Sequence, residues 1–135
     1  MDKTLLFKLS IFFAVVGLIV SIYLTLVHYF PAVPLACSES GVINCENVLT
    51  SQYALILGIP VAVYGIAFFV AELIAILLIK NNDYFLALSG IGIAFVGYFI
   101  YAEYMVKSIC IYCTTVHICT LALLIIAIMQ DQKKK

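Results

Sequence analysis

The stretch IPVAVYGIAFFVAELIAILLI, residues 59–79, decides the fold class of this chain. Its only charged side chain is Glu72. An α-helix needs about 20 consecutive apolar residues to cross the hydrocarbon core of a bilayer. Backbone N–H and C=O groups cannot stay unpaired in lipid, so an apolar run of this length crosses as a helix. The stretch therefore predicts a membrane-spanning helix.

Three more apolar runs lie on either side of this stretch, at about residues 5–30, 84–106 and 109–129. The whole chain is 66% hydrophobic and 10% charged, whereas soluble domains are about half apolar and a quarter charged. The first run is longer than the core of a signal peptide, which has roughly 7–15 residues. We therefore predict an all-α membrane protein, a four-transmembrane-helix bundle that forms a single integral-membrane domain over residues 1–135. Gly90, Gly92 and Gly97 would let the third helix approach its neighbours closely.

The long polar segment is the loop of residues 31–58 between the first two helices. Pro31 and Pro34 end the first helix, because proline cannot continue the hydrogen-bond ladder. Asn44 has the character of an N-cap, and residues 45 to about 53 permit a short surface helix against the membrane.

The lysines predict the orientation of the helices, because basic residues concentrate on the cytoplasmic side. Four crossings put six of the seven lysines on one side, and only Lys107 falls on the other. The six are Lys3, Lys8, Lys80, Lys133, Lys134 and Lys135. We therefore expect a multi-pass protein, in a microbial cell membrane, with both termini cytoplasmic. The loop 31–58 and the turn between the third and fourth helices would face outward. The chain has no basic face for a nucleic-acid partner.

Cys110 and Cys113 in the run SICIYCTTVH, residues 108–117, stand three apart at the predicted start of the fourth helix. This spacing puts both sulfur atoms on one helical face. Ser108 is the expected N-cap, and the amide groups of a first helical turn lower the pKa of a cysteine there. His117 shares the face of Cys110, either as a functional group or as a core histidine bonded to a neighbouring helix.

Cys37 and Cys45 lie eight apart in the outward loop, where a cysteine pair normally forms a disulfide. They are either a structural staple or, with Cys110 and Cys113, two activated pairs that exchange thiols and disulfides. Zinc is the main rival for four cysteines and a histidine, but the loop pair is too widely spaced for a zinc knuckle, so we expect no metal.

Together these residues resemble the vitamin K epoxide reductase family over most of the chain. The loop pair, Cys37 and Cys45, matches the family in spacing. The family's cysteine–serine–aromatic order is present in the run CENVLTSQYA, as Cys45, Ser51 and Tyr53. The family's active-site motif is similar to the run CIYCTT, with Cys110 and Cys113. GIPVAVYG, residues 58–65, resembles the microbial branch.

The resemblance implies a four-helix bundle around a quinone of menaquinone or ubiquinone type, capped by the loop and its short helix. It implies that Cys113 lies next to the quinone, that Cys110 exchanges with Cys45, and that Cys37 exchanges with Cys45 and with an outside thiol. Ser51 and Tyr53 would help to form the site. Apart from the resemblance, the position of His117 within a membrane helix favours a role in polarising a quinone carbonyl.

The resemblance also predicts the activity and the partner of this chain. We expect a membrane oxidoreductase that accepts electrons from a thioredoxin-like protein outside the cytoplasm and reduces a quinone. Many bacterial relatives carry a fused thioredoxin-like domain, and because this chain ends at Lys135 we expect a separate partner protein. The mammalian enzymes have a tyrosine where His117 stands and an asparagine near Ile59 and Pro60, which argues against vitamin K epoxide as substrate.

Three alternatives remain at the level of the sequence. Glu72 within a membrane helix would suit a small proton-coupled exporter, but that reading leaves the paired cysteines unexplained. A structural tetraspan protein with a disulfide-stapled loop would carry no electrons to a quinone. The disulfide-bond protein B type also couples thiols to quinone with four helices, but its cysteine order differs.

Overall fold

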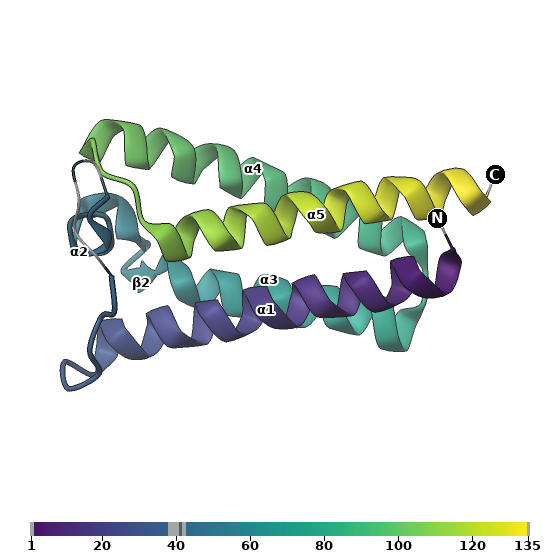
Figure 1. Ribbon diagram of the computed structural model, residues 1–135, viewed down its shortest axis with the longest axis horizontal. Coiled ribbons are helices and arrows are strands. Elements are labelled where there is room, and N and C mark those ends of the chain that lie inside the picture. Colours follow the sequence, from purple (N-terminus) through teal and green to yellow (C-terminus); the bar gives the residue numbers. More distant parts are fainter. Residues whose placement is uncertain (1, 38–40, 42, 135) are drawn as a thin grey trace.

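The computed structural model describes residues 2–37, 41 and 43–134. Its long helices are α1 (Lys3–Tyr29), α3 (Val61–Ile74) with the π-helical continuation η2 (Ala75–Ile79), α4 (Asn82–Val106) and α5 (Ile111–Lys134). Each of these four segments is long and apolar enough to cross a membrane. The prediction of an all-α four-helix membrane bundle is confirmed. Figure 1 shows the helices side by side, with both ends of the chain at the same end of the bundle.

The bundle is held by the packing of α1 against α3 and α5 and of α5 against α4. Its core contains Leu6, Ala14, Phe69, Phe85 and Leu123, all nearly or fully buried. Many large apolar side chains point outward instead; Phe12, Ile19 and Leu78 are 57%, 60% and 77% exposed. An apolar outer surface on four long helices fits a lipid environment.

Small residues let the helices approach one another at particular points. A Cβ atom added to Gly17 would lie 2.2 Å from the ring of Phe69, and one added to Gly92 would lie 2.6 Å from the ring of Phe68. Close approach was also predicted for Gly90 and Gly97, and this was wrong, because nothing lies within 4 Å of a Cβ atom added at either position. These two glycines face away from the neighbouring helices.

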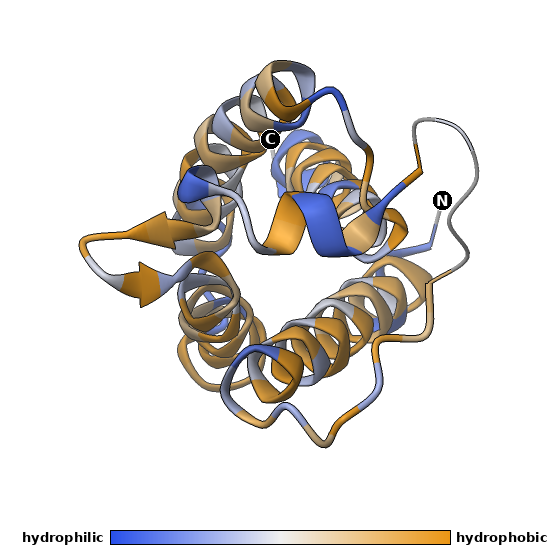
Figure 2. Ribbon diagram, turned by 90° about the vertical axis from the view of Figure 1, so that its left-hand side faces the viewer, coloured by the Kyte–Doolittle hydropathy of each residue, from blue (hydrophilic) through white to orange (hydrophobic). Residues whose placement is uncertain are grey.

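The segment between α1 and α3 covers one end of the bundle. Helix α2 (Cys45–Leu49) crosses this end in Figure 2, and the short 3₁₀ helix η1 (Gln52–Ala54) follows it. Asn44 is the N-cap as predicted; its side-chain oxygen accepts a hydrogen bond of 2.9 Å from the N–H of Asn47. The predicted surface helix is interrupted between α2 and η1 because Ser51 has an extended backbone.

A hairpin of β1 (Leu55–Ile56) and β2 (Ile59–Pro60) leads into α3 and was not predicted. Leu57 and Gly58 turn the chain with positive φ angles of 55° and 78°. Helix α3 consequently begins at Val61, after the hairpin, rather than near residue 59.

The lysines separate along the length of the bundle. Lys3 and Lys8 are in the first two turns of α1, Lys80 follows η2, and Lys133 and Lys134 end α5. These stretches lie at the end of the bundle that holds both termini (Figure 1), and Lys135 is outside the described residues. Lys107 lies at the opposite end, where it closes α4 in a left-handed conformation. The end that carries α2 is therefore the one with few lysines.

Candidate active site

A disulfide bond joins Cys37 to Cys45 at the end of the bundle that α2 covers. Cys45 is the first residue of α2 and is fully buried, whereas Cys37 is half-buried. The Cα atoms of the two residues are 6.2 Å apart. A thiol arriving from water can therefore reach the sulfur of Cys37 more readily than that of Cys45.

Cys110 directly precedes α5, and its sulfur caps that helix. It accepts a hydrogen bond of 3.4 Å from the backbone N–H of Cys113, and its carbonyl oxygen accepts one of 2.9 Å from the N–H of Thr114. The prediction that Ser108 caps this helix was wrong. The hydroxyl of Ser108 accepts a hydrogen bond of 2.7 Å from the side-chain amide of Asn47, on α2, instead.

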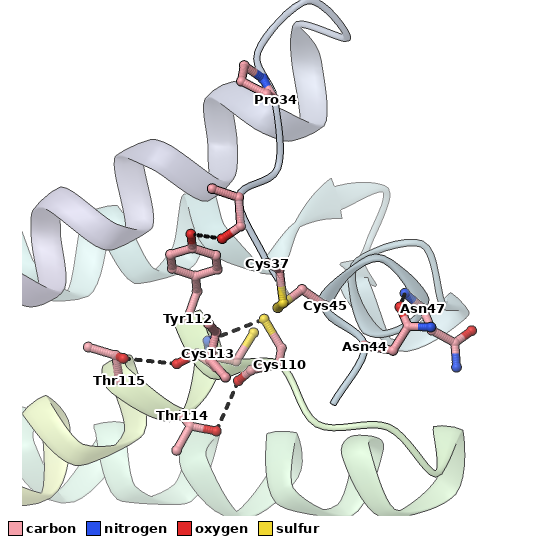
Figure 3. The surroundings of a disulfide bond; sticks show 12 residues. Pro34, Cys37, Asn44, Cys45, Asn47, Cys110, Tyr112, Cys113, Thr114 and Thr115 are labelled. Atoms are coloured by element: carbon pink, nitrogen blue, oxygen red, sulfur yellow. Dashed lines mark hydrogen bonds between the residues drawn. A yellow bond between two sulfur atoms is a disulfide. The ribbon is translucent and has the colours of Figure 1, made fainter. Parts of the chain in front are cut away.

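Two chain segments pair side by side and bring Cys45 to Cys110. Ile43 and Ile109 form a parallel bridge, and the N–H of Asn44 donates a hydrogen bond of 3.0 Å to the carbonyl of Ile109. Cys45 and Cys110 follow this pairing directly on their own segments. Figure 3 shows the sulfur of Cys110 pointing at the Cys37–Cys45 disulfide, beside Cys45.

The surroundings of Cys110 favour its thiolate form. The pKa of this thiol lies below its ordinary value because the Cys113 thiol donates a hydrogen bond to the sulfur. Burial opposes this effect, and the backbone N–H groups of Cys113 and Tyr112 add to it. Cys110 thus carries an activated sulfur next to a closed disulfide.

A cavity of about 330 Å³ lies between the long helices, next to Cys113 and toward the interior of the bundle. Its walls are mainly apolar and include the rings of Phe68, Phe95 and Phe99. Cys113 and His117 also line it, and the ring of His117 stacks on that of Phe99 with centroids 5.9 Å apart. Ligand pockets commonly combine apolar walls with a few polar groups in this way.

Ser51 and Tyr53 lie close to Cys113 but outside this cavity. They line a second, smaller hollow of about 20 Å³ that Cys113 also borders. The hydroxyl of Ser51 donates a hydrogen bond of 2.7 Å to the carbonyl of Val48 and so fixes the end of α2. The structure thus brings all seven residues proposed from the sequence to one end of the bundle. They are Cys37, Cys45, Ser51, Tyr53, Cys110, Cys113 and His117.

Glu103, near the end of α4, was overlooked as a site residue by reasoning from the sequence. It borders the small hollow with Cys113, and the backbone N–H of Cys110 interacts with its carboxylate. Its position seven residues before Cys110 in the sequence was a sign that the two residues could be neighbours. The tight turn at Lys107, which ends α4, brings them together in the structure.

Glu72 and Cys119 lie deeper in the bundle. Glu72 is fully buried, and the hydroxyl of Ser89 on α4 donates a hydrogen bond of 2.8 Å to its Oε1 atom. Cys119 is packed in the hydrophobic core. Within the described part of the chain, no group of three or more His, Cys, Asp or Glu side chains could hold a metal ion.

These features define an integral, multi-pass membrane protein with a disulfide beside a second cysteine pair and an apolar cavity next to that pair. The sequence model of the vitamin K epoxide reductase family matches residues 8–128 of the 135. The chain therefore belongs to this family, whose members are oxidoreductases, and the predicted resemblance is confirmed. A comparison with curated proteins gave no match.

Proposed function

We propose that this protein is a quinone-dependent thiol–disulfide oxidoreductase that oxidises a thioredoxin-like protein outside the cytoplasm. The position of Cys110 carries the proposal. Its sulfur points at the disulfide on one side and accepts hydrogen bonds from Cys113, which borders the cavity, on the other. This arrangement suits the transfer of electrons from the exposed loop to the interior of the bundle.

Electrons enter at Cys37, because Cys45 is fully buried. A thiolate of the partner attacks the sulfur of Cys37, the Cys37–Cys45 bond breaks, and Cys45 leaves as a thiolate. The second thiol of the partner then attacks the mixed disulfide, so that the partner departs oxidised and Cys37 is a thiol.

The electrons move inward from the state in which Cys110 and Cys113 are joined by a disulfide. Cys45 attacks the sulfur of Cys110, which forms a Cys45–Cys110 bond and releases Cys113 as a thiolate. Cys37 then attacks Cys45, the Cys37–Cys45 bond closes again, and Cys110 is released. The arrangement in the structure, with the loop disulfide closed and Cys110 and Cys113 as thiols, corresponds to the end of this sequence.

The cavity beside Cys113 fits a quinone, because it is walled by aromatic rings and carries few polar groups. A quinone of menaquinone or ubiquinone type supplies a two-electron acceptor that is soluble in lipid. Cys113 and Cys110 together lose two electrons and two protons as their disulfide forms. His117 and Phe99 would hold the acceptor ring, and Ser51 and Tyr53 would support Cys113 from the side of the loop.

The orientation of the bundle is also part of the proposal. Both termini would be cytoplasmic, and the cysteine pairs would face the outside of a microbial cell membrane, because the lysines concentrate at the end opposite the site. The exporter alternative has little support, because Glu72 bonds to Ser89 within the packed bundle and does not line the cavity.

The test is the consumption of a quinone by the purified protein in the presence of a reduced thioredoxin-like protein. We expect Cys113→Ala to reduce the rate to background, because Cys113 is the cysteine among the described residues that line the cavity. Cys119→Ala is the matched control on the same helix and should keep most of the rate. Equal rates for wild type and Cys113→Ala would refute the mechanism.

A further inference from the structure

The backbone just before Cys37 is held by a tyrosine from α1. The hydroxyl of Tyr23 donates a hydrogen bond of 2.7 Å to the carbonyl of Pro34. The same oxygen accepts a hydrogen bond of 3.1 Å from the N–H of Ala36. One side chain thus fixes both ends of the segment 34–36, and Cys37 follows directly.

A second tyrosine holds the same segment from α5. The hydroxyl of Tyr112 donates a hydrogen bond to the carbonyl of Ala36, as Figure 3 shows. The rings of Tyr23 and Tyr112 pack together with centroids 5.2 Å apart. Tyr112 stands between Cys110 and Cys113, so the motif that carries the inner cysteine pair also holds the backbone of Cys37. We call Tyr23 and Tyr112 the tyrosine clamp.

The other side of the loop is attached to the bundle separately. Asn44 bonds to Ile109, and Asn47 bonds to Ser108, so Cys45 is attached beside Cys110 by contacts that do not involve its disulfide. Cys37 is held at this end of the bundle by the disulfide to Cys45 and, through the backbone of residues 34–36, by the tyrosine clamp. The tyrosine clamp is thus placed to hold Cys37 when the Cys37–Cys45 bond is open.

We propose that the tyrosine clamp holds Cys37 near Cys45 while the Cys37–Cys45 bond is open, and thereby speeds its closure. The inference rests on the proposed function, in which Cys37 attacks the sulfur of Cys45 in the Cys45–Cys110 bond. The Cys37–Cys45 bond forms, the Cys45–Cys110 bond breaks, and Cys110 leaves as a thiolate with the electron pair. The proton of Cys37 goes to water, since Cys37 is only half-buried. Tyr23 and Tyr112 are positioning residues, because they act through the backbone of Cys37.

The first test measures how readily the loop disulfide closes, and it needs neither quinone nor partner protein. In a Cys110→Ser/Cys113→Ser background, the Cys37–Cys45 pair is equilibrated with reduced and oxidised glutathione. Adding Tyr23→Phe and Tyr112→Phe removes three hydrogen bonds but keeps the ring pair. We expect the effective concentration of the Cys37 thiol at the Cys45 thiol to fall roughly tenfold, because the tyrosine hydroxyls no longer hold the backbone before Cys37. Tyr29→Phe, on the exposed end of α1, should leave it unchanged.

The second test separates positioning from a general loss of stability. In the otherwise native chain, acid trapping and mass spectrometry should find several times more Cys45–Cys110 species in Tyr23→Phe/Tyr112→Phe than in wild type. Thermal unfolding of the two proteins in detergent should differ little. An effective concentration within twofold of the parent, or no excess of the trapped species, overturns the proposal. If the double variant does not fold, Tyr23→Phe alone, which removes two of the three bonds, gives the same comparison. A wild type that does not reduce quinone would refute the proposed function, while the glutathione result would still test the clamp.

Discussion

At the scale of single residues, Cys110 and Cys113 have different surroundings although they belong to one motif. Cys110 caps α5 and points at the loop disulfide, whereas Cys113 lies one turn further along and borders the cavity. The hydrogen bond from the Cys113 thiol is the largest influence that lowers the pKa of Cys110. Each sulfur therefore helps to set the chemistry of the other.

This dependence predicts how the ionisation of Cys110 changes with pH. A lowered pKa means that the thiolate forms at a pH below the ordinary 9.0. Cys113→Ala removes the main donor, so the pKa should rise and the thiolate should appear only at higher pH. Far-ultraviolet thiolate absorbance, followed in a pH titration with the loop disulfide closed, measures the change. Subtraction of a Cys110→Ser titration assigns the signal, and a transition at unchanged or lower pH in Cys113→Ala would contradict the assignment.

The residues of the site differ in how well the sequence predicts them. The four cysteines, Ser51, Tyr53 and His117 were proposed from motif, spacing and the family resemblance, and the structure brings them to one end of the bundle. Glu103 and the tyrosine clamp were not found, because their roles depend on contacts between segments far apart in sequence. Tyr112 contacts Ala36 across 76 positions, and no local pattern encodes such a contact.

At the scale of elements, local sequence accounts for the long helices and for the cap of α2. Apolar length predicts the membrane helices, and Asn44 predicts the start of α2 through its own side chain. The start of α5 was misplaced because Ile109 pairs with Ile43 and keeps Ser108 out of the helix. Local propensity is a weak guide where a tertiary contact decides the conformation.

The packing of α4 predicts how the cavity responds to a single methyl group. A Cβ atom at Gly92 would lie 2.6 Å from the ring of Phe68 and 2.8 Å from a methyl group of Thr120, and all three residues line the cavity. Gly92→Ala should push these side chains into the cavity and raise the KM for quinone about tenfold. Glutathione equilibration of the loop disulfide should not change.

Gly90→Ala is the matched control for this experiment, since it lies on the same helix and a Cβ atom there meets nothing within 4 Å. It should leave the KM for quinone at the wild-type value. If both variants raise the KM equally, the effect comes from the helix as a whole, and the cavity is not where the quinone binds.

At the scale of the whole molecule, the bundle connects an aqueous surface to an apolar interior over a short path. Cys37 is half-buried, Cys45 and Cys110 are fully buried, and Cys113 borders the cavity. Burial thus increases along the proposed path of the electrons until they reach the cavity. The backbone pairing of residues 43 and 44 with residue 109 places Cys45 beside Cys110. The proposed exchange between these two cysteines therefore needs no hinge motion.

The proposed direction of the reaction requires the capped end of the bundle to face outward, and labelling in cells tests this requirement. Gln52, the first residue of η1, is exposed on the capped end, and Lys134, the last residue of α5, is exposed at the opposite end, which holds both termini (Figure 1). We expect a membrane-impermeant maleimide to label Gln52→Cys in intact cells and Lys134→Cys only after permeabilisation. The wild type is the control for background, which includes any labelling of the half-buried thiol of Cys113; Cys110 and Cys119 are buried, and Cys37 and Cys45 are in a disulfide. The reverse pattern would place the cysteine pairs in the cytoplasm, where thiols stay reduced, and a partner outside the cell could not reach Cys37.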